Sequence, residues 1–373
     1  MYYLVAPGGI PNFGDEQIVA TWLRHLAEIA PDADVVLDCL NPAGVTAAVR
    51  AVHPRLRLTN VLWQLCMVHW NAGPAAAELV GDIVASPGRS RLRIDDAESL
   101  DLLRRAAVVH LLGGGYLNGI WPAYLGLPGG AAAAARCSGG RAVMTGQGLS
   151  PAPNGAAGLL RDLLGRFDLV DVRDSPSAEL AGEDASCSGD DVFLGLGAPA
   201  RPAGDSPEMM VSVQSLLSHV GVPETVRMVE RAVAAWKPAD VGLLECSPRE
   251  DRELLDLLEA ALPAVRRYSL AEVLSEGLPA AAGQCWLSTR FHPHLFAAAA
   301  GASGVAVDIN ADYYGTKHRS LVAYGSRWQV VDGPVLTARP MAGGFPPEAL
   351  RTLRAAKRAV ADRIYPAPGV SVI

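Results

Sequence analysis

The residues best suited to catalysis or ligand binding lie at positions 288–294, which read Ser-Thr-Arg-Phe-His-Pro-His. An apolar, strand-like run precedes them at 285–287, and a helix-like run follows at 295–300. Because proline is favoured at the first position of a helix, Pro293 predicts His292 as the N-cap. The N–H groups and dipole of a helix N-terminus favour anions, and Arg290 adds a forked donor for phosphate or carboxylate. The segment therefore predicts an anion-binding catalytic corner, with a purely structural arginine ion pair as the alternative.

The composition narrows the class of partner. The chain of 373 residues has a net charge of −7, which argues against nucleic-acid binding, because such proteins need clustered Lys and Arg. We therefore expect any anionic ligand to be held by local positive charge. The six cysteines are widely spaced, without a C-x-x-C pair, which favours reduced thiols and a cytoplasmic location. A membrane span at 106–135 is rejected because glycines and prolines interrupt this apolar stretch.

Short β-rich runs alternate with longer amphipathic runs along the chain, which is typical of α/β architecture with parallel sheets. The expected strands are 2–6, 35–37, 108–112, 141–145, 169–172, 209–214, 241–245, 265–268, 285–288 and 304–309. The expected helices include 15–30, 223–236, 249–262, 292–300 and 346–364. The length exceeds what one core usually serves, so two domains are expected.

A proline- and glycine-rich stretch at 197–207 indicates the linker between them. We expect an N-terminal domain at 1–197, a C-terminal domain at 208–345, and a terminal segment at 346–373 whose helix could pack back on the first domain. Cationic side chains are spread along that helix, and a solvated helix face is the favoured interpretation. They are Arg351, Arg354, Lys357, Arg358 and Arg363.

Ligands of open parallel sheets bind at the carboxyl ends of the strands, so the loops after strands are where chemistry is expected. The loop at 8–16 opens a helix that Asp15 or Asn12 can cap, and its glycines allow close approach of a ligand. The loops at 113–115 and 146–148 offer backbone donors in the same way. Ligand loops and ordinary turns are the two interpretations. The triple glycine is not the G-x-G-x-x-G dinucleotide fingerprint, and the chain has no P-loop sequence.

Two further features also have two interpretations each. Arg173 ends a strand, where its side chain would point into a cleft, and an ion pair with Asp171 or Asp174 is the alternative. Several aromatic residues could stack on a sugar ring, although core packing is the commoner role. They are Trp63, Trp70, Trp121 and Tyr124.

Taken in order, these pieces resemble the polysaccharide pyruvyl transferase family. The similarity extends from about residue 5 to about residue 320, and the ordered set is specific although no single piece is. The matching pieces are Asn12-Phe13-Gly14-Asp15-Glu16, Gly113-Gly114-Gly115, Gly146-Gln147-Gly148, Val172-Arg173-Asp174-Ser175, Gly189-Asp190 and Arg290-Phe291-His292.

The resemblance implies a GT-B-like fold, with two Rossmann-like domains whose parallel sheets face each other across a cleft. The N-terminal domain would bind the acceptor and the C-terminal domain the donor. The implied enzyme transfers the enolpyruvyl carbons of phosphoenolpyruvate onto two hydroxyls of a sugar in a glycan or glycolipid precursor, forming a pyruvate ketal and releasing phosphate. The expected partners are phosphoenolpyruvate and a glycan or lipid-linked sugar, with no cofactor, metal or nucleic acid. A place at the inner membrane face is compatible with this expectation.

The resemblance further implies that Arg290 and His292 bind or activate phosphoenolpyruvate. Lys317 is the candidate for the family's lysine, although the segment at 308–319 is longer here than the family's S-Y-x-x-K. An imidazole suits proton delivery near neutral pH, so His292 is our candidate acid. Asp15 is the candidate base for the acceptor hydroxyl, with a simple helix cap as the alternative. The expected substrate-binding residues are Asn12, Gly14, Gly113, Gly114, Gly115, Gln147, Arg173 and Lys317.

Two other functions stay open. One is a nucleotide-sugar glycosyltransferase of the same architecture, whose diphosphate would use the same helix N-terminus. The other is a non-catalytic, sugar-binding homologue. A zinc site at His292 and His294 is not favoured, because no cysteine or third histidine lies at ligand spacing.

Overall fold

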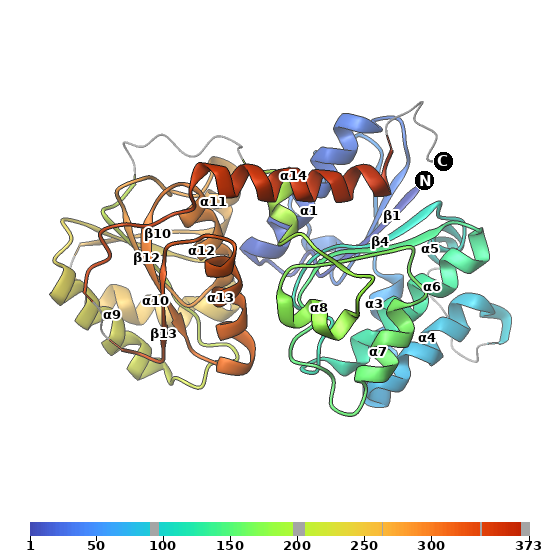
Figure 1. The fold of residues 1–373 in the computed structure, drawn as a ribbon, viewed down its shortest axis with the longest axis horizontal. Coiled ribbons are helices and arrows are strands. Elements are labelled where there is room, and N and C mark those ends of the chain that lie inside the picture. Colours follow the sequence, from blue (N-terminus) through green and yellow to red (C-terminus); the bar gives the residue numbers. More distant parts are fainter. Residues whose placement is uncertain (90–96, 197–205, 263, 336–337, 367–373) are drawn as a thin grey trace. The chain divides into compact units, whose positions relative to one another are not determined.

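The computed structural model describes residues 1–89, 97–196, 206–262, 264–335 and 338–366, which form two compact units (Figure 1). Unit 1 contains Met1–Ile10, Asp15–Gly195 and the described residues from Arg354 onward. Unit 2 contains Pro11–Gly14 and the described residues of 196–353. Most of the expected linker, 197–205, lies outside the described residues.

Unit 1 is built on seven parallel strands in the order β3-β2-β1-β4-β5-β6-β7. The strands are β1 (Tyr2–Ala6), β2 (Val35–Cys39), β3 (Leu56–Thr59), β4 (Val108–Leu111), β5 (Arg141–Gln147), β6 (Leu169–Val172) and β7 (Ser186–Cys187). The helices are α1 (Phe13–Ile29), α2 (Ala47–Arg50), α3 (Val61–Val68), α4 (Ala76–Ala85), α5 (Ala97–Leu103), α6 (Gly126–Ser138), α7 (Ala157–Leu164), α8 (Ser175–Ala181) and the second half of α14 (Pro347–Ile364).

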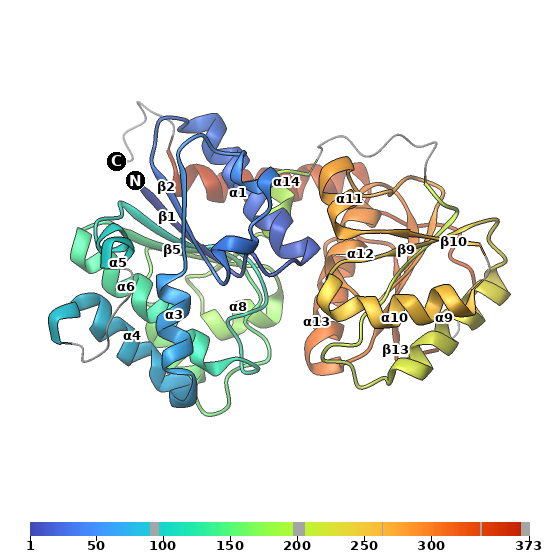
Figure 2. The same ribbon diagram turned by 180° about the vertical axis from the view of Figure 1, so that it is seen from behind.

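Both faces of this sheet are covered, as is usual for parallel sheets. Because side chains alternate along a strand, Tyr3 and Val5 enter the same core, which α3, α4, α6 and α7 close (Figures 1 and 2). His110 of β4 contacts a second core, where Trp22 of α1 and Tyr365 pack against it with ring centroids 4.6 and 5.8 Å away. Tyr365 follows α14, so the end of the described chain helps to complete unit 1.

Unit 2 has six parallel strands in the order β10-β9-β8-β11-β12-β13. The strands are β8 (Met209–Ser212), β9 (Val241–Leu244), β10 (Val265–Tyr268), β11 (Cys285–Ser288), β12 (Ser303–Asp308) and β13 (Gln329–Asp332). The helices are α9 (Val222–Trp236), α10 (Pro248–Ala261), α11 (Leu270–Glu276), α12 (Phe291–Ala299) and α13 (Thr316–Ala323). Helices α9 and α10 lie together on one face of the sheet (Figure 2), and α12 and α13 pack together on the other (Figure 1).

Both sheets have the doubly wound strand order of Rossmann-like proteins, which confirms the expected α/β fold with two parallel sheets. The strand order reverses between β1 and β4 in unit 1 and between β8 and β11 in unit 2. Ligands of such sheets bind beyond the carboxyl ends of the strands at this reversal. In unit 2, that position is occupied by the residues that connect β11 to α12.

Every inner strand and the edge strand β10 were expected from the sequence, whereas the other three edge strands were not. Strands β6, β10 and β11 have the expected bounds, whereas β3, β7 and β13 were not expected. Strands β3 and β13 alternate between exposed and half-buried residues, and only one of their eight residues is buried. The sequence therefore lacks a continuous apolar run that would have marked them.

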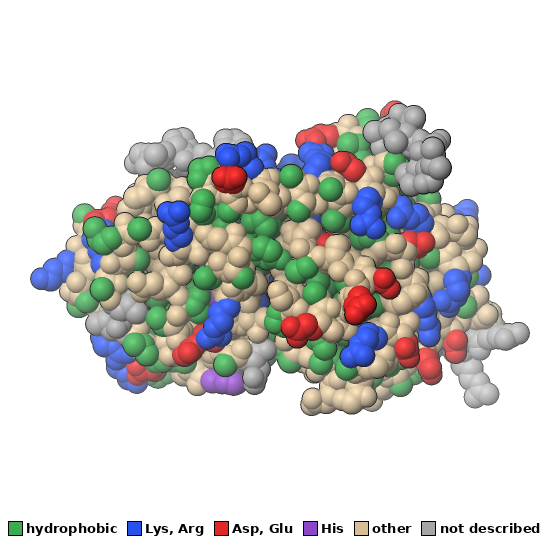
Figure 3. All heavy atoms as spheres, viewed as in Figure 1, with side chains coloured by type: hydrophobic (Ala, Val, Ile, Leu, Met, Phe, Trp, Pro, Cys, Tyr) green, Lys and Arg blue, Asp and Glu red, His purple; other side chains and the backbone are tan. Residues whose placement is uncertain are grey.

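Charged side chains of both signs are mixed on the surface that Figure 3 shows. Lysine and arginine side chains lie scattered among aspartate and glutamate side chains on this face, over its described residues. In the described part of the chain, every helix is too short or too polar to cross a membrane.

Candidate functional site

Unit 2 places the Arg-Phe-His segment at the carboxyl end of β11, which pairs with β8. Helix α12 begins at Phe291, and Arg290 is its N-cap, with φ −108° and ψ 137°. The prediction of His292 as the N-cap is therefore wrong: His292 is the second helical residue and Pro293 the third. Proline fits there too, because N–H groups of the first turn have no intrahelical partner to lose. Among the described residues no side chain caps this N-terminus, so its donors and dipole remain suited to an anion.

Arg290 is a buried cation, only 7% exposed, and one side of its guanidinium is ion-paired. Its Nη2 binds the fully buried carboxylate of Asp251 and lies 3.6 Å from a carboxylate oxygen of Glu250. Burial lowers the pKa of Arg290, but Asp251 more than offsets this effect, so the pKa lies above its ordinary value. The ion pair that the sequence left open is therefore present. The Nε atom, in contrast, is buried without a hydrogen-bond partner among the described residues.

His292 lies directly against the loop that begins α1. A Cβ atom on Gly14 would come within 1.9 Å of the His292 Nδ1, so position 14 requires glycine. The N–H of Phe13 donates to the carbonyl of Cys246 at 2.9 Å, and the Phe13 ring packs against α12. These contacts explain why Pro11–Gly14 groups with unit 2, although the sequence assigned it to the N-terminal domain. The structure thus brings the Asn-Phe-Gly and Arg-Phe-His motifs together.

Lys317 is the second residue of α13, the helix that follows β12, and it is 7% exposed. Its Nζ lies 3.2 Å from the ring centroid of Tyr313 and 5.0 Å from that of Tyr314, within cation–π range. Burial raises the pKa of Tyr314 to about 12, and the nearby Arg290 charge acts against this rise. Lys317 and Arg290 are therefore neighbours of the same tyrosine.

The polar residues after β1 have distinct roles. The Oδ1 of Asn12 accepts the N–H of Gly14 at 3.1 Å, so Asn12 caps α1, and Asp15 follows Gly14 directly. Glu16 turns back and accepts the N–H of Gly9 at 3.3 Å. Burial raises the pKa of Glu16 to about 7, while the Gly9 hydrogen bond lowers it and Asp15 raises it. Glu16 was expected only as part of a motif; an acidic residue in the first helical turn, able to reach back, was the available signal.

The two glycine loops of unit 1 are hydrogen-bonded to each other. The N–H of Gly148 donates to the carbonyl of Gly114 at 2.8 Å. The N–H of Gly113 donates to a carboxylate oxygen of Asp191 at 2.8 Å, and the carbonyl of Gly115 accepts a side-chain amide at the same distance. Hydrogen bonds therefore join the backbone that follows β4 to the backbone at the end of β5.

Gln147, which is the last residue of β5, is completely buried. Its amide nitrogen donates to the carbonyl of Leu112 and, at 2.8 Å, to the hydroxyl of Tyr116. The Gln147 side chain thus helps to join the two loops. Its expected role in substrate binding stays a prediction, as do those of Asn12, Gly14 and the triple glycine.

Two of the loop glycines make room for buried charged side chains. A Cβ atom at Gly146 would lie 2.5 Å from the Oδ1 of Asp191, and one at Gly148 would lie 2.4 Å from the Nη2 of Arg173. Arg173 is 3% exposed, and its Nε lies 3.6 Å from a carboxylate oxygen of Asp174. The ion-pair alternative for Arg173 is therefore present, and substrate binding by Arg173 stays a prediction.

Helix α14 carries a cation that the sequence interpretation placed wrongly. The four arginines of its cationic set are exposed, as the solvated-face interpretation expects. Lys357 is instead completely buried, and its Nζ binds Asp171 at 2.6 Å and Asp191 at 3.2 Å. The spacing of cations along the helix carried no signal for this, because the acidic partners are distant in the sequence.

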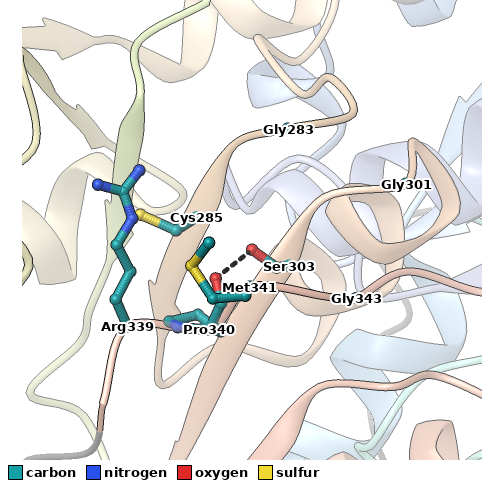
Figure 4. Close-up of a pocket in the computed structure, with 8 residues that line it drawn as sticks. All are labelled: Gly283, Cys285, Gly301, Ser303, Arg339, Pro340, Met341 and Gly343. Carbon is teal, nitrogen blue, oxygen red and sulfur yellow. Dashed lines mark hydrogen bonds between the residues drawn. The ribbon is translucent and has the colours of Figure 1, made fainter.

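A separate pocket of about 380 Å³ opens where β11 and β12 begin (Figure 4). Arg339 and Cys285 line it, and the Ser303 hydroxyl donates to the carbonyl of Pro340 at 3.0 Å. Since β11 runs from this pocket towards Arg290, the pocket lies at the opposite edge of the sheet from the N-terminus of α12. In the described part of the chain, no group of three or more His, Cys, Asp or Glu residues is placed to hold a metal ion.

The two Rossmann-like units define a GT-B-like fold. The chain is similar to a protein from Listeria monocytogenes described as a UDP-N-acetylglucosamine 2-epimerase, with a TM-score of 0.53 and 10% identity over 100% of this chain and 99% of that chain. It is also similar to S. aureus MnaA, solved with UDP, with a TM-score of 0.50 and 9% identity over 98% of this chain and 89% of that chain. At these identities the similarity shows the fold alone.

The chain belongs to the polysaccharide pyruvyl transferase family, whose model matches residues 12–310. This match confirms the resemblance carried by the ordered motifs. It begins at Asn12 and includes Arg290 and His292, and it ends before Lys317 and Lys357. A search of curated proteins finds no match to the chain.

Proposed function

We propose that this protein transfers the enolpyruvyl carbons of phosphoenolpyruvate onto two hydroxyls of a sugar, forming a pyruvate ketal and releasing phosphate. The acceptor is a sugar in a glycan or a lipid-linked saccharide. Membership of the pyruvyl transferase family supports the transfer of pyruvyl groups in polysaccharide biosynthesis. The donor and the ketal are the specific parts of the proposal.

The observation that carries the proposal is the meeting of Gly14, His292 and Arg290 at the N-terminus of α12. Phosphoenolpyruvate carries a phosphate and a carboxylate, and an acidic protein must hold it with local donors. The helix N-terminus, the Nε of Arg290 and the ammonium of Lys317 are donors of the right kind. Because Asp251 already neutralises part of Arg290, we assign a larger share of the anion's charge to Lys317 and the helix.

In the proposed reaction, His292 gives a proton to the methylene carbon of phosphoenolpyruvate, and a sugar hydroxyl attacks the adjacent carbon. Asp15, which follows Gly14 in the chain, accepts the proton of that hydroxyl. Phosphate then leaves with the electrons of its C–O bond. The second hydroxyl attacks the same carbon and closes the ring, and its proton is released with the phosphate. The C=C double bond and one C–O bond are thereby exchanged for a methyl group and two new C–O bonds.

Donor binding and acceptor-dependent phosphate release test the proposal. Isothermal titration should show binding of phosphoenolpyruvate and no binding of UDP-sugars. At least one member of a panel of pyranosides should then stimulate phosphate release from phosphoenolpyruvate. Binding of nucleotide-sugars alone would overturn the proposal in favour of a glycosyltransferase. Failure of every acceptor to stimulate phosphate release would favour a non-catalytic homologue.

The role of His292 has its own test. His292→Ala should lower turnover by about 10²- to 10⁴-fold, the usual contribution of a general acid, without changing the thermal unfolding midpoint. His219→Ala is the matched control, because His219 is an exposed histidine of the same unit. Most of the wild-type activity in His292→Ala would remove this residue from the proton transfer.

A further inference from the structure

Lys357 is a fully buried lysine whose ammonium group is saturated. It donates to the Oδ2 of Asp171 at 2.6 Å, to the carbonyl of Gly189 at 2.7 Å and to the Oδ1 of Asp191 at 3.2 Å. An ammonium has three N–H donors, so these contacts use all of them. Burial lowers the pKa of Lys357, but the two carboxylates more than offset this, and the pKa lies above its ordinary value. Lys357 is therefore a fixed charge that has no donor left for a ligand.

The two carboxylates that Lys357 binds hold the glycine loops. The Oδ2 of Asp191 accepts the N–H of Gly113 at 2.8 Å and the hydroxyl of Thr145 at 2.7 Å. The Oδ2 of Asp171 accepts the N–H of Gly146 at 3.3 Å. The N–H groups of Gly113 and Gly146 are thus each hydrogen-bonded to a buried carboxylate, and the ammonium of Lys357 binds both carboxylates.

The loop glycines also depend on this arrangement. A side chain at Gly146 would collide with Asp191, since its Cβ atom would lie 2.5 Å from the Oδ1, and a Cβ atom at Gly113 would make a tight contact of 3.0 Å with the Oδ2. Asp191 is completely buried, and burial raises its pKa while Lys357 lowers it. Without the ammonium, two buried carboxylates would lose their counter-charge, which costs free energy. Movement of the loops that they hold would lower this cost.

We propose that Lys357 is a positioning residue, which acts through Asp171 and Asp191 to set the backbone at 113–115 and 146–148 for the acceptor sugar. This inference rests on the proposed function, in which these loops bind the acceptor. It extends the functional machinery to α14, beyond the residues 12–310 that the family model matches. The ammonium itself touches neither substrate.

The variant Lys357→Met tests the proposal, with Arg354→Met as the matched control on the exposed side of α14. In the full-length variant, hydrogen exchange should be accelerated relative to the wild type. This acceleration should be larger at the amides of Gly113 and Gly146 than at those of β1 and β2. In steady-state kinetics, KM for the acceptor should rise on the order of 10- to 100-fold, as expected for misplaced binding groups. The affinity for phosphoenolpyruvate should stay unchanged, because the donor site is assigned to unit 2. The control should behave like the wild type in both measurements.

Wild-type exchange at Gly113 and Gly146, or faster exchange spread evenly over unit 1, would overturn the positioning role. A lower unfolding midpoint with an unchanged acceptor KM would do the same. If Lys357→Met does not fold, the double variant Lys357→Met with Asp171→Asn removes one buried charge of each sign. This double variant should show the same local exchange, and wild-type behaviour would overturn the proposal. Absence of pyruvyl transfer in the wild type would instead count against the proposed function, while the exchange measurement would still test how Lys357 holds the loops.

Discussion

Lys357 of unit 1 and Arg290 of unit 2 are both buried against carboxylates, and they differ in the hydrogen-bond donors that remain for a ligand. In unit 1, Lys357 is completely buried and its three donors are used by protein acceptors. In unit 2, Arg290 is held by Asp251, but its Nε has no hydrogen-bond partner among the described residues. A saturated cation can only hold its own protein, whereas a cation with a buried, unused donor can hold a ligand. This difference supports the proposed positioning role of Lys357 and the proposed anion-binding role of Arg290.

Each unit also buries titratable side chains whose pKa values are shifted by burial. Unit 1 buries the carboxyl of Glu16, which is 2% exposed. Unit 2 buries a pair of histidines, His294 and His318, whose Nδ1 atoms lie 3.1 Å apart. One ring must donate and the other accept, and because burial lowers the pKa of both rings, both are neutral at pH 7. A buried acid and a buried base should respond to pH in opposite directions.

The histidine pair should give the larger effect. Burial lowers the pKa of His318 to about 4 and that of His294 well below its ordinary value, with His318 adding to the effect. Unfolded histidines bind protons below about pH 6.5, while the folded protein keeps His318 neutral down to about pH 4. The contribution of the histidine pair to the free energy of unfolding should therefore be fully present above pH 6.5 and be lost as the pH is lowered towards 4. For His318 alone, this loss is on the order of 3 kcal/mol. Chemical denaturation at pH 7 and pH 4.5 measures this loss.

His318→Asn should remove much of that acid sensitivity, and His219→Gln, at an exposed position of the same unit, should leave it intact. The same loss of stability in His318→Asn as in the wild type would show that the acid sensitivity arises elsewhere. The assignment of this sensitivity to the buried pair of His294 and His318 would then fail.

Sequence patterns located the parts of the fold that depend on local order. The strand-like run at 285–288 is β11, and the triple glycine follows β4 as expected, whereas β5 extends to Gln147 and includes Gly146. These features follow from apolar runs and turn residues, which a sequence displays directly. The order of the family motifs indicated the GT-B-like fold.

Features that depend on distant partners could not be found in this way. Lys357 looks like the arginines around it, and its acidic partner Asp171 lies 186 positions earlier in the chain. The same holds for Gly14, whose need for glycine comes from His292 and not from its own turn. The start of α12 was misplaced because proline is tolerated throughout the first helical turn, so Pro293 did not mark its first residue.

Glu16 should give a smaller effect of opposite sign. Burial raises its pKa to about 7, so the folded protein keeps the proton in a range where the unfolded chain has lost it. The stability is fully present below about pH 4.5 and is lost as the pH rises through 7. Glu16→Gln should therefore raise the free energy of unfolding at pH 8 by up to about 3 kcal/mol and change it little at pH 4.5. Glu28→Gln, at an exposed position of α1, is the control, and equal gains at both pH values would contradict the assignment.

Arg290→Lys tests whether Arg290, unlike Lys357, uses a free donor to bind the anionic substrate. A lysine keeps the positive charge beside Asp251 but lacks the forked guanidinium, so folding should survive while the donor at Nε is lost. A hydrogen bond to a charged group contributes about 1.5–3 kcal/mol, so the affinity for phosphoenolpyruvate should fall on the order of 10- to 100-fold in isothermal titration. Arg252→Lys is the control, because its side chain is 64% exposed on the neighbouring helix α10. Unchanged affinity in Arg290→Lys would mean that Arg290 holds only Asp251, and that Arg290 has a structural role like that of Lys357.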